Sequence, residues 1–299
     1  MKKSALTCLT AFAVMAAAPV YADGRLEKIK SSGEIALGHR DSSIPFSYLD
    51  DKQKPIGYSL DICYKIIDAV KAKIGVDKIN IKLVPVTSST RIPLLANGTV
   101  DMNCGSSTNT IERQAQVWFA PTTFVTATRF LAKKSSNLNK LEDFKGKTVV
   151  STAGTSNIRW LTSANEEQKL NLNIIAAKDH AEAQLTVASG RAAAFFMDDI
   201  LLAGLVATSR DPSEWMISKD AYTIEPYALM IPKDDPEFKK IVDDTIKGMM
   251  KDGSLAQLYK KWFESPIPPK NVNLNLPMSA QLKKAIANPT DSADPNVYK

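Results

Sequence analysis

The sequence predicts an α/β fold in two lobes, each built on a central, mostly parallel sheet flanked by helices. Short apolar runs of strand length alternate with amphipathic stretches of helical period, which is typical of parallel sheets. This alternation occurs twice, and a chain of 299 residues exceeds the usual size of a single core. We therefore expect two sheets, joined by two crossings of the chain near residues 126–130 and 222–227.

The first series of elements ends near residue 117. We expect strands at residues 34–38, 79–86 and 100–104, and helices at residues 59–72, 91–96 and 111–117. Ser59 is a suitable N-cap for the first helix, and Asn97-Gly98 is a typical C-terminal signal after the second.

The second series repeats this order and defines the domain boundaries. We expect strands at residues 147–151, 173–176 and 193–197, and helices at residues 157–167, 181–189 and 200–207. The elements at residues 227–231, 238–251 and 255–263 are too few to bury a core of their own, so they should return to the first lobe. The prediction is thus lobe 1 at residues 23–128 plus 225–299 and lobe 2 at residues 129–224, with the polar tail wrapping the surface.

The N-terminus has the features of a cleaved export signal. Lys2 and Lys3 precede an apolar run too short to span a bilayer, and small residues lead up to Ala22. We predict a signal peptide at residues 1–22, cleaved after Ala22, and a location outside the cytoplasm. Nothing later in the sequence is apolar for long enough to cross a membrane.

Charge and cysteine content narrow the possible partners. Loss of residues 1–22, which carry Lys2 and Lys3 and no acid, lowers the net charge from +6 to +4, which fits an anionic ligand. The basic residues are spread out and often alternate with acids, so the pattern argues against nucleic-acid binding. Two cysteines remain, Cys63 and Cys104; they could form a disulfide or both stay buried and reduced, and the sequence leaves this open.

Four junctions between a strand and a helix are rich in Ser, Thr, Gly and Arg. They lie at residues 38–43, 87–91, 104–109 and 153–156. Ligands of open α/β sheets bind outside the carboxyl ends of the strands, and amides at a helix start form an anion site. A hydroxyl at any one junction is more simply explained as a helix N-cap. Four junctions together, two of which carry an arginine, predict a binding site.

Three arginines and one aspartate are the charged candidates for this site. Arg40 and Arg91 lie in two of the turns, and Arg113 follows a third by one helical turn. A guanidinium offers a rigid fork of donors that matches a carboxylate, although each arginine could equally form a surface ion pair. Asp198 ends an apolar strand, where it would accept hydrogen bonds from an ammonium group or cap the next helix.

The sequence lacks the usual patterns of metal sites and of catalysis. His39 and His180 are its two histidines, and neither belongs to a set of ligands at a known metal spacing. No nucleophile elbow, HExxH motif or phosphate-binding glycine loop occurs. We therefore expect no cofactor, no metal and no catalysis. His180 follows a strand-to-helix junction, where it would line the cleft or face solvent.

Several sequence blocks together resemble a known family. They lie at residues 38–48, 57–59, 91–99, 104–109, 112–114, 177–180, 189–191, 196–199 and 266–270. These blocks resemble the glutamate/aspartate periplasmic binding proteins of ABC importers over nearly the whole mature chain. The resemblance implies the type II periplasmic-binding-protein fold, a monomer in the periplasm, and delivery of L-glutamate or L-aspartate to the permease subunits of an importer.

The resemblance also implies a set of ligand-binding residues. The ligand's α-carboxylate would be held by Ser106, Thr108 and Arg113, and its α-ammonium by Asp198. The side-chain carboxylate would be held by Arg40, Ser88, Arg91 and His180. The remaining contacts would come from Thr155 and Ser156 of the second lobe and from Tyr227 at the return crossing. Ser156 stands where relatives are expected to have threonine, and the strand at residues 227–230 lacks a cysteine that could pair with Cys104.

Two other functions remain open at this point. Binding-protein folds also occur as periplasmic enzymes, which would need a cleft acid or base, and Asp198 is the candidate. A free-standing protein that presents its ligand to a separate chemosensor is the other.

Overall fold

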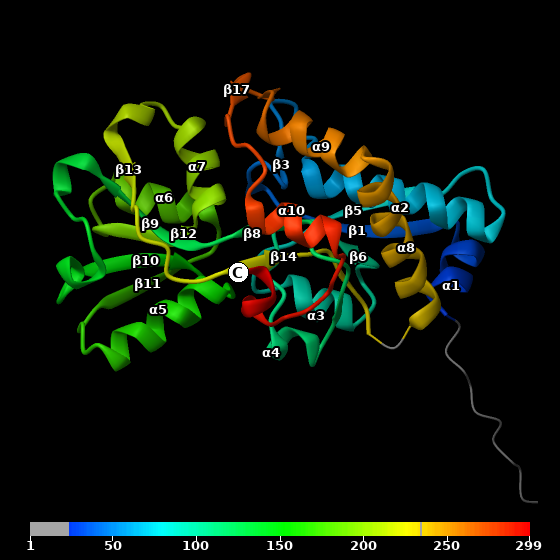
Figure 1. Ribbon diagram of the computed structural model, residues 1–299, viewed down its shortest axis with the longest axis horizontal. Coiled ribbons are helices and arrows are strands. Elements are labelled where there is room, and N and C mark those ends of the chain that lie inside the picture. Colours follow the sequence, from blue (N-terminus) through cyan, green and yellow to red (C-terminus); the bar gives the residue numbers. More distant parts are fainter. Residues whose placement is uncertain (1–23, 234) are drawn as a thin grey trace, which may run out of the picture.

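The computed structural model describes residues 24–233 and 235–299. Two sheet-rich lobes lie side by side along the longest axis of the molecule (Figure 1). The predicted signal peptide at residues 1–22 lies outside the described residues. Within the described part of the chain, no helix has both the length and the apolar character needed to cross a membrane.

The first lobe has a five-stranded sheet. Its strands are β1 (Glu34–His39), β5 (Asn80–Pro85), β6 (Met102–Asn103), β7 (Trp118–Phe119) and β15 (Met230–Ile231). The helices around it are α1 (Arg25–Ser32), α2 (Tyr58–Ile74), α3 (Arg91–Ala96), α4 (Ile111–Gln114), α8 (Pro236–Asp252) and α9 (Ser254–Phe263). The strand order is β5-β1-β6-β15-β7, in which β1 is parallel to β5 and β6 while β15 is antiparallel to its neighbours. The late elements thus return to the first lobe.

The second lobe has a five-stranded sheet of its own. Its strands are β9 (Thr128–Lys133), β10 (Thr148–Thr152), β11 (Asn173–Ala177), β12 (Ala194–Asp198) and β13 (Trp215–Ile217). Its helices are α5 (Ser156–Glu167), α6 (His180–Ala188) and α7 (Asp199–Ala207). The strand order is β11-β10-β12-β9-β13, with β10 parallel to β11 and β12 and β9 antiparallel to β12 and β13. Phe130, Phe144 and Phe196 pack edge to face or tilted in its core.

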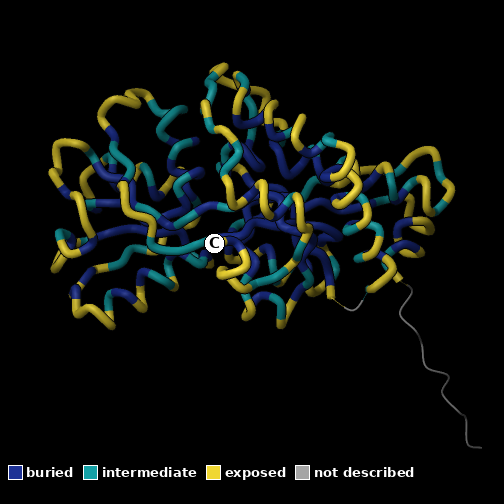
Figure 2. Tube along the Cα trace, viewed as in Figure 1, coloured by how far each residue is buried: buried dark blue, intermediate teal, exposed yellow. Residues whose placement is uncertain are grey.

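Two short strands carry the chain between the lobes. They are β8 (Phe124–Thr126) and β14 (Glu225–Tyr227), which pair antiparallel; we call them the hinge strands. Both run through the centre of the molecule (Figure 1), and all their residues are buried except Val125, which is half-buried. The burial trace shows a buried interior surrounded by exposed loops (Figure 2). The expectation of two hinge crossings is confirmed. The division at residues 128/129 and 224/225 stays a prediction.

Several short elements have no counterpart in the sequence prediction. They are the strands β2 (Ser42–Ser43), β3 (Ser47–Leu49), β4 (Pro55–Ile56), β16 (Pro266–Ile267) and β17 (Val272–Asn273), and the helix α10 (Ala280–Ala287). Single 3-10 turns lie at Lys134–Ser136, Leu141–Phe144, Pro212–Glu214 and Pro295–Tyr298. Strands of two or three residues are too short to show an alternation of burial. The tail does run over the surface, but it also buries Leu282 of α10 and Tyr298.

Cys63 and Cys104 are joined by a disulfide bond, with their Cα atoms 6.2 Å apart. Cys63 lies on the buried face of α2, and Cys104 directly follows β6. The bond therefore ties α2 to the turn that carries Ser106 and Thr108. The question that the sequence left open is answered in favour of the bridge.

Candidate functional site

Arg40, Arg91 and Arg113 are buried where the two lobes meet, with only 2–3% of each exposed; we call them the arginine cluster. None of the three takes part in an ion pair among the described residues. Burial lowers the pKa of Arg40 and Arg113 to about 10. Burial lowers the pKa of Arg91 well below its ordinary value, and repulsion from Arg113 and Arg40 lowers it further. The alternative of surface arginines in ion pairs is wrong for all three.

The arginine cluster is held by neutral acceptors. Arg91 Nη1 donates to the Ser106 carbonyl at 2.7 Å and to Ser107 Oγ at 2.8 Å. Arg113 Nη1 donates to the Thr108 carbonyl at 2.8 Å, and its Nη2 donates across the lobe boundary to the Gly154 carbonyl at 3.1 Å. These bonds orient the guanidinium groups but do not neutralise them, so the site keeps its positive charge.

Four buried polar atoms of the predicted site residues have no hydrogen-bond partner in the described part of the chain. They are Arg40 Nη1, Ser88 Oγ, Arg91 Nε and Ser106 Oγ. Buried polar atoms in folded proteins are almost always paired, and an unpaired one costs about 1–3 kcal/mol. Two guanidinium groups and two hydroxyls with spare donors, close to the third guanidinium of Arg113, form a site suited to carboxylate oxygens.

Asp198 supplies a buried acid opposite the arginines. Its Oδ1 accepts a hydrogen bond from Asn157 Nδ2 at 2.7 Å, and its Oδ2 accepts one from the Tyr227 hydroxyl. Burial, with the nearby charge of Glu225, raises the pKa of Asp198 to about 8. Asp198 occupies the N-cap position of α7, but its side chain makes no capping bond. Of the two roles considered from the sequence, capping is excluded for this side chain, and its role as partner of an ammonium group stays a prediction.

His180 is buried at the start of α6, so it does not face solvent. Its Nε2 lies 3.4 Å from Arg40 Nη2, and its Nδ1 lies 2.9 Å from Thr152 Oγ1. Burial, together with repulsion from Arg40 and Arg91, lowers the pKa of His180 well below its usual range. Because a guanidinium can only donate, Nε2 is the acceptor and Nδ1 carries the proton. A neutral His180 thus orients Arg40.

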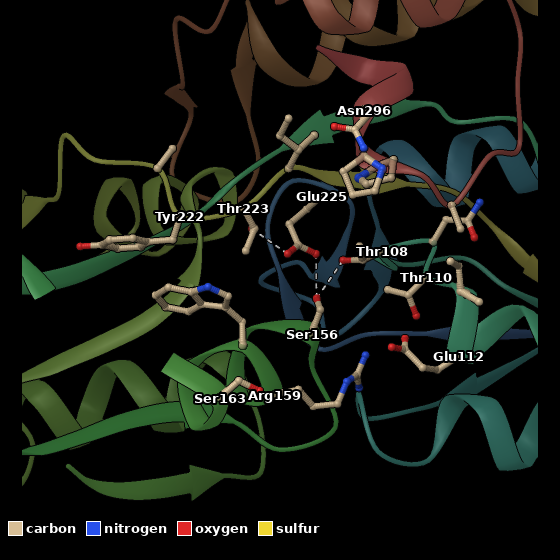
Figure 3. A pocket seen from close by; sticks show the side chains of 18 of the residues that line it. Thr108, Thr110, Glu112, Ser156, Arg159, Ser163, Tyr222, Thr223, Glu225 and Asn296 are labelled. Carbon is tan, nitrogen blue, oxygen red and sulfur yellow. Dashed lines mark hydrogen bonds between the residues drawn. The ribbon is translucent and has the colours of Figure 1, made fainter. Parts of the chain in front are cut away.

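Glu225 is a buried acid of the site that the sequence analysis missed. Its carboxylate accepts hydrogen bonds from Ser156 Oγ at 2.8 Å and from Thr223 Oγ1 at 2.7 Å. Ser156 Oγ also lies 3.1 Å from Thr108 Oγ1, so one chain of polar contacts joins the first lobe, the second lobe and β14 (Figure 3). The only signal in the sequence is an acid directly before Pro226-Tyr227 at the return crossing.

Thr155 is placed at the site but its hydroxyl serves the fold. It accepts a hydrogen bond from the Ile158 amide at 3.2 Å as the N-cap of α5, and it donates to the Thr152 carbonyl at 2.6 Å. Among the other predicted residues outside the arginine cluster, side-chain polar contacts with the cluster, with Glu225 or with one another are made by Thr108, Ser156, His180, Asp198 and Tyr227. The hydroxyls of Ser88 and Ser106 are buried without a partner among the described residues. For Thr155 we therefore expect the backbone, at the start of α5, to be the part that faces a ligand.

A hollow of about 880 Å³ lies beside the site and is lined in part by Glu225. It is lined from the first lobe by Thr108 and Glu112, from the second by Ser156 and Arg159, and from the tail by Asn296, among others (Figure 3). The arginine cluster does not line it. Thr108 connects the two, because it lines the hollow and its carbonyl accepts a hydrogen bond from Arg113 Nη1.

Residues 35–265 match the family described as bacterial extracellular solute-binding proteins, family 3. The chain belongs to this family. The match spans both sheets and both hinge strands, and it ends before the β16–β17 hairpin. The resemblance noted from the sequence blocks is thus confirmed.

Characterised relatives of this family 3 protein include binding proteins for acidic amino acids. It is 49% identical to the L-glutamate/L-aspartate-binding protein of Pseudomonas aeruginosa, over 94% of each chain. It is 47% identical to the glutamate/aspartate import solute-binding protein of Escherichia coli, over 93% of this chain and 91% of that one. A glutamine-binding protein of an ABC transporter from Bacillus subtilis is more distant, at 28% identity over 80% of this chain and 84% of its own. These relatives are named as binding proteins, not as enzymes.

Solved structures confirm the predicted two-lobe fold. A mutant of the arginine-binding protein ArgBP from T. maritima superposes with a TM-score of 0.71 at 23% identity, over 80% of this chain and 99% of its own. An ancestral amino acid-binding protein, a precursor of cyclohexadienyl dehydratase, gives a TM-score of 0.68 at 27% identity, over 79% of this chain and 98% of its own.

Proposed function

We propose that this family 3 solute-binding protein binds L-glutamate or L-aspartate between its lobes. It hands the ligand to the permease subunits of an ABC importer, and it works in the periplasm after cleavage behind Ala22. The observation that carries the proposal is the arginine cluster, in which three buried guanidinium groups lack carboxylate partners. Relatives at 47–49% identity that are named for glutamate and aspartate support the same ligands.

The charges of the site suit a ligand of net charge minus one. Once the ligand's ammonium has ionised Asp198, the three arginines exceed Asp198 and Glu225 by one positive charge, and the neutral His180 adds none. Glutamate or aspartate carries two carboxylates and one ammonium, so its net charge balances the excess. A bound neutral amino acid would leave the excess buried, which is unfavourable in a site away from water.

The two ends of the ligand meet different groups in this proposal. Arg113, with the hydroxyls of Ser106 and Thr108, holds the α-carboxylate, and Asp198, held by Tyr227, accepts from the α-ammonium. At the other end the spare donors of Arg40, Arg91 and Ser88 bind the side-chain carboxylate, with His180 orienting Arg40. Each charge-assisted hydrogen bond contributes on the order of 1.5–3 kcal/mol. Ser156 closes from the second lobe.

The second candidate function is catalysis, favoured by the likeness to a precursor of cyclohexadienyl dehydratase. Asp198, with its pKa raised to about 8, is the group that could move a proton. We propose binding without catalysis, since the ligand's ammonium occupies that carboxylate. Recovery of the amino acid unchanged after long incubation supports binding, and a chemically altered product supports the enzyme.

The test is calorimetry on protein that has been unfolded, freed of ligand and refolded, titrated with glutamate, aspartate, glutamine and asparagine. Replacing glutamate with glutamine leaves Arg40 or Arg91 without its anion, which costs roughly 2–5 kcal/mol. We expect binding of both acidic amino acids and at least about 30-fold weaker binding of their amides. Failure of millimolar glutamate and aspartate to give heat or to raise the melting temperature refutes the proposal.

A further inference from the structure

The lobes also touch at a second place, away from the arginine cluster, at the C-terminal end of α7. The ammonium group of Lys270, in the turn between β16 and β17, donates to the Thr208 carbonyl at 2.5 Å and lies 3.4 Å from the Ser209 carbonyl. Thr208 is the C-cap residue of α7 in the second lobe. Figure 1 shows the hairpin reaching over the lobe boundary toward α7.

The chemistry of this contact suits a helix end. The last carbonyls of a helix have no partners inside it and carry partial negative charge. α7 has no basic residue in its own last turn, so the cation comes from the other lobe. The hairpin belongs firmly to that lobe, because β16 packs against α9 and the Pro268 carbonyl accepts from the Tyr48 hydroxyl at 2.7 Å.

A glycine in α7 provides an independent contact of the same helix with the first lobe. A Cβ atom built on Gly204 would lie 2.7 Å from the Ile44 carbonyl oxygen and 2.9 Å from Ile44 Cβ. Ile44 lies in the loop that follows Arg40. This loop is held in the first lobe by the backbone amide of Arg40, which donates a hydrogen bond to Ser47 Oγ at 2.8 Å. Gly204 has ordinary helical backbone, so its own lobe has no need of a glycine there. The close approach of the other lobe is what requires it.

We propose that Lys270 and Gly204 form a closure latch: a pair of contacts on α7 that stabilises the closed lobes and so raises ligand affinity without touching the ligand. The inference rests on the proposed function. A ligand that is enclosed between lobes binds with an apparent affinity set partly by the closing equilibrium. Contacts made only in the closed form therefore tighten binding and slow release.

Lys270 lies outside the segment that the family model matches, whereas Gly204 lies inside it. The family match ends at residue 265, and the T. maritima structure covers 80% of this chain while this chain covers 99% of that one. The β16–β17 hairpin that carries Lys270 lies beyond the matched segment. Solute-binding proteins of this family without such a hairpin would have to close without this contact.

The main test is Gly204→Ala, because its effects on folding and on closure have opposite signs. Alanine favours a helix over glycine, so the ligand-free melting temperature should stay the same or rise. The clash with Ile44 should raise the Kd for glutamate by about five- to a hundredfold, as overpacking of a closed interface does. The matched control is Gly248→Ala in α8, where a Cβ meets nothing within 4 Å, and which should bind as the original protein does.

The second variant is Lys270→Met, with Lys260→Met in the last turn of α9 as its control. A cation at the C-terminal end of a helix stabilises that end only modestly, so we expect the Kd for glutamate of Lys270→Met to rise by about two- to fivefold. The rise should come mainly from faster ligand release, and it should become smaller at high salt. Unchanged Kd in both Gly204→Ala and Lys270→Met, with binding by the original protein intact, overturns the latch alone. A fall in the ligand-free melting temperature of Gly204→Ala also overturns it. Absence of binding by the original protein overturns the proposed function and the latch with it.

Discussion

The Tyr227 hydroxyl donates a hydrogen bond to Oδ2 of Asp198, which connects hinge strand β14 with the end of β12 in the second lobe. Burial and the adjacent acid raise the pKa of Tyr227 well above its ordinary value, so the phenol stays protonated and remains a donor. Asn157 Nδ2 donates to the other oxygen of Asp198 at 2.7 Å. The orientation of this carboxylate is thus set from both the hinge and the second lobe.

Asp198→Asn should stabilise the ligand-free protein at pH 7 while it abolishes glutamate binding. Asparagine can still accept from Asn157 and donate to the Tyr227 oxygen, but it has no charge for an ammonium group. The pKa of Asp198 is about 8 in the folded protein and about 4 in the unfolded chain, so the carboxyl takes up a proton on folding. The free energy of unfolding therefore falls as pH rises from about 4 to 8, because keeping Asp198 protonated becomes less favourable. We expect a gain of about 1–4 kcal/mol in the free energy of unfolding at pH 7, measured with urea. Destabilisation at pH 7 would contradict this view of the site.

Glutamate binding near neutral pH should release a proton from Asp198. Below pH 8 the ligand-free carboxyl is mostly protonated, and it must ionise to accept from the ligand's ammonium. Affinity should therefore rise from pH 6 to 8, by up to about tenfold per pH unit. Calorimetry at pH 7 in buffers of different ionisation enthalpy measures the released proton directly. If glutamate binds but releases almost no protons at pH 7, then Asp198 is already ionised in the ligand-free protein or is not the partner of the ammonium group.

Arg113→Ala and Arg40→Ala should separate recognition of the two ends of the ligand. In the proposed function Arg113 holds the α-carboxylate that all amino acids share, so its loss should abolish binding of glutamate, aspartate, glutamine and asparagine alike. Loss of Arg40 should weaken the acidic pair by roughly 2–5 kcal/mol and leave the amides little changed. The control is Arg210→Ala, at an exposed position in the second lobe. Normal glutamate binding by Arg40→Ala would disprove its role even if Arg113 behaves as expected.

The three arginines of the cluster could be predicted from the sequence, because each follows a strand or turn that the pattern of apolar and polar residues identifies. Arg40 comes directly after β1, and parallel strands bring their carboxyl ends to one edge of the sheet. The same reasoning placed Asp198 at the end of β12. The periodicity of the sequence is enough to place these residues, because each lies at the end of a strand whose position is set within one sheet.

The rest of the site depends on how the two lobes meet, which local patterns do not encode. Glu225 lies in a three-residue strand whose members are all buried, so no alternation marks it. The contact of Lys270 with α7 joins segments that are 62 positions apart and belong to different lobes. Residues of this kind can be found only when both sheets are placed together.

Loss of the Cys63–Cys104 disulfide should destabilise the first lobe and weaken binding indirectly. The bond closes a chain segment spanning 41 positions and anchors the turn before Ser106 to α2. Replacing both cysteines with alanine should lower the free energy of unfolding by about 2–4 kcal/mol, because the unfolded chain regains the freedom that the bond removed. Urea unfolding with and without reductant measures this. Reductant should reproduce the effect in the original protein and change nothing in the double variant; equal stability of all four samples would show that the bond is absent in solution.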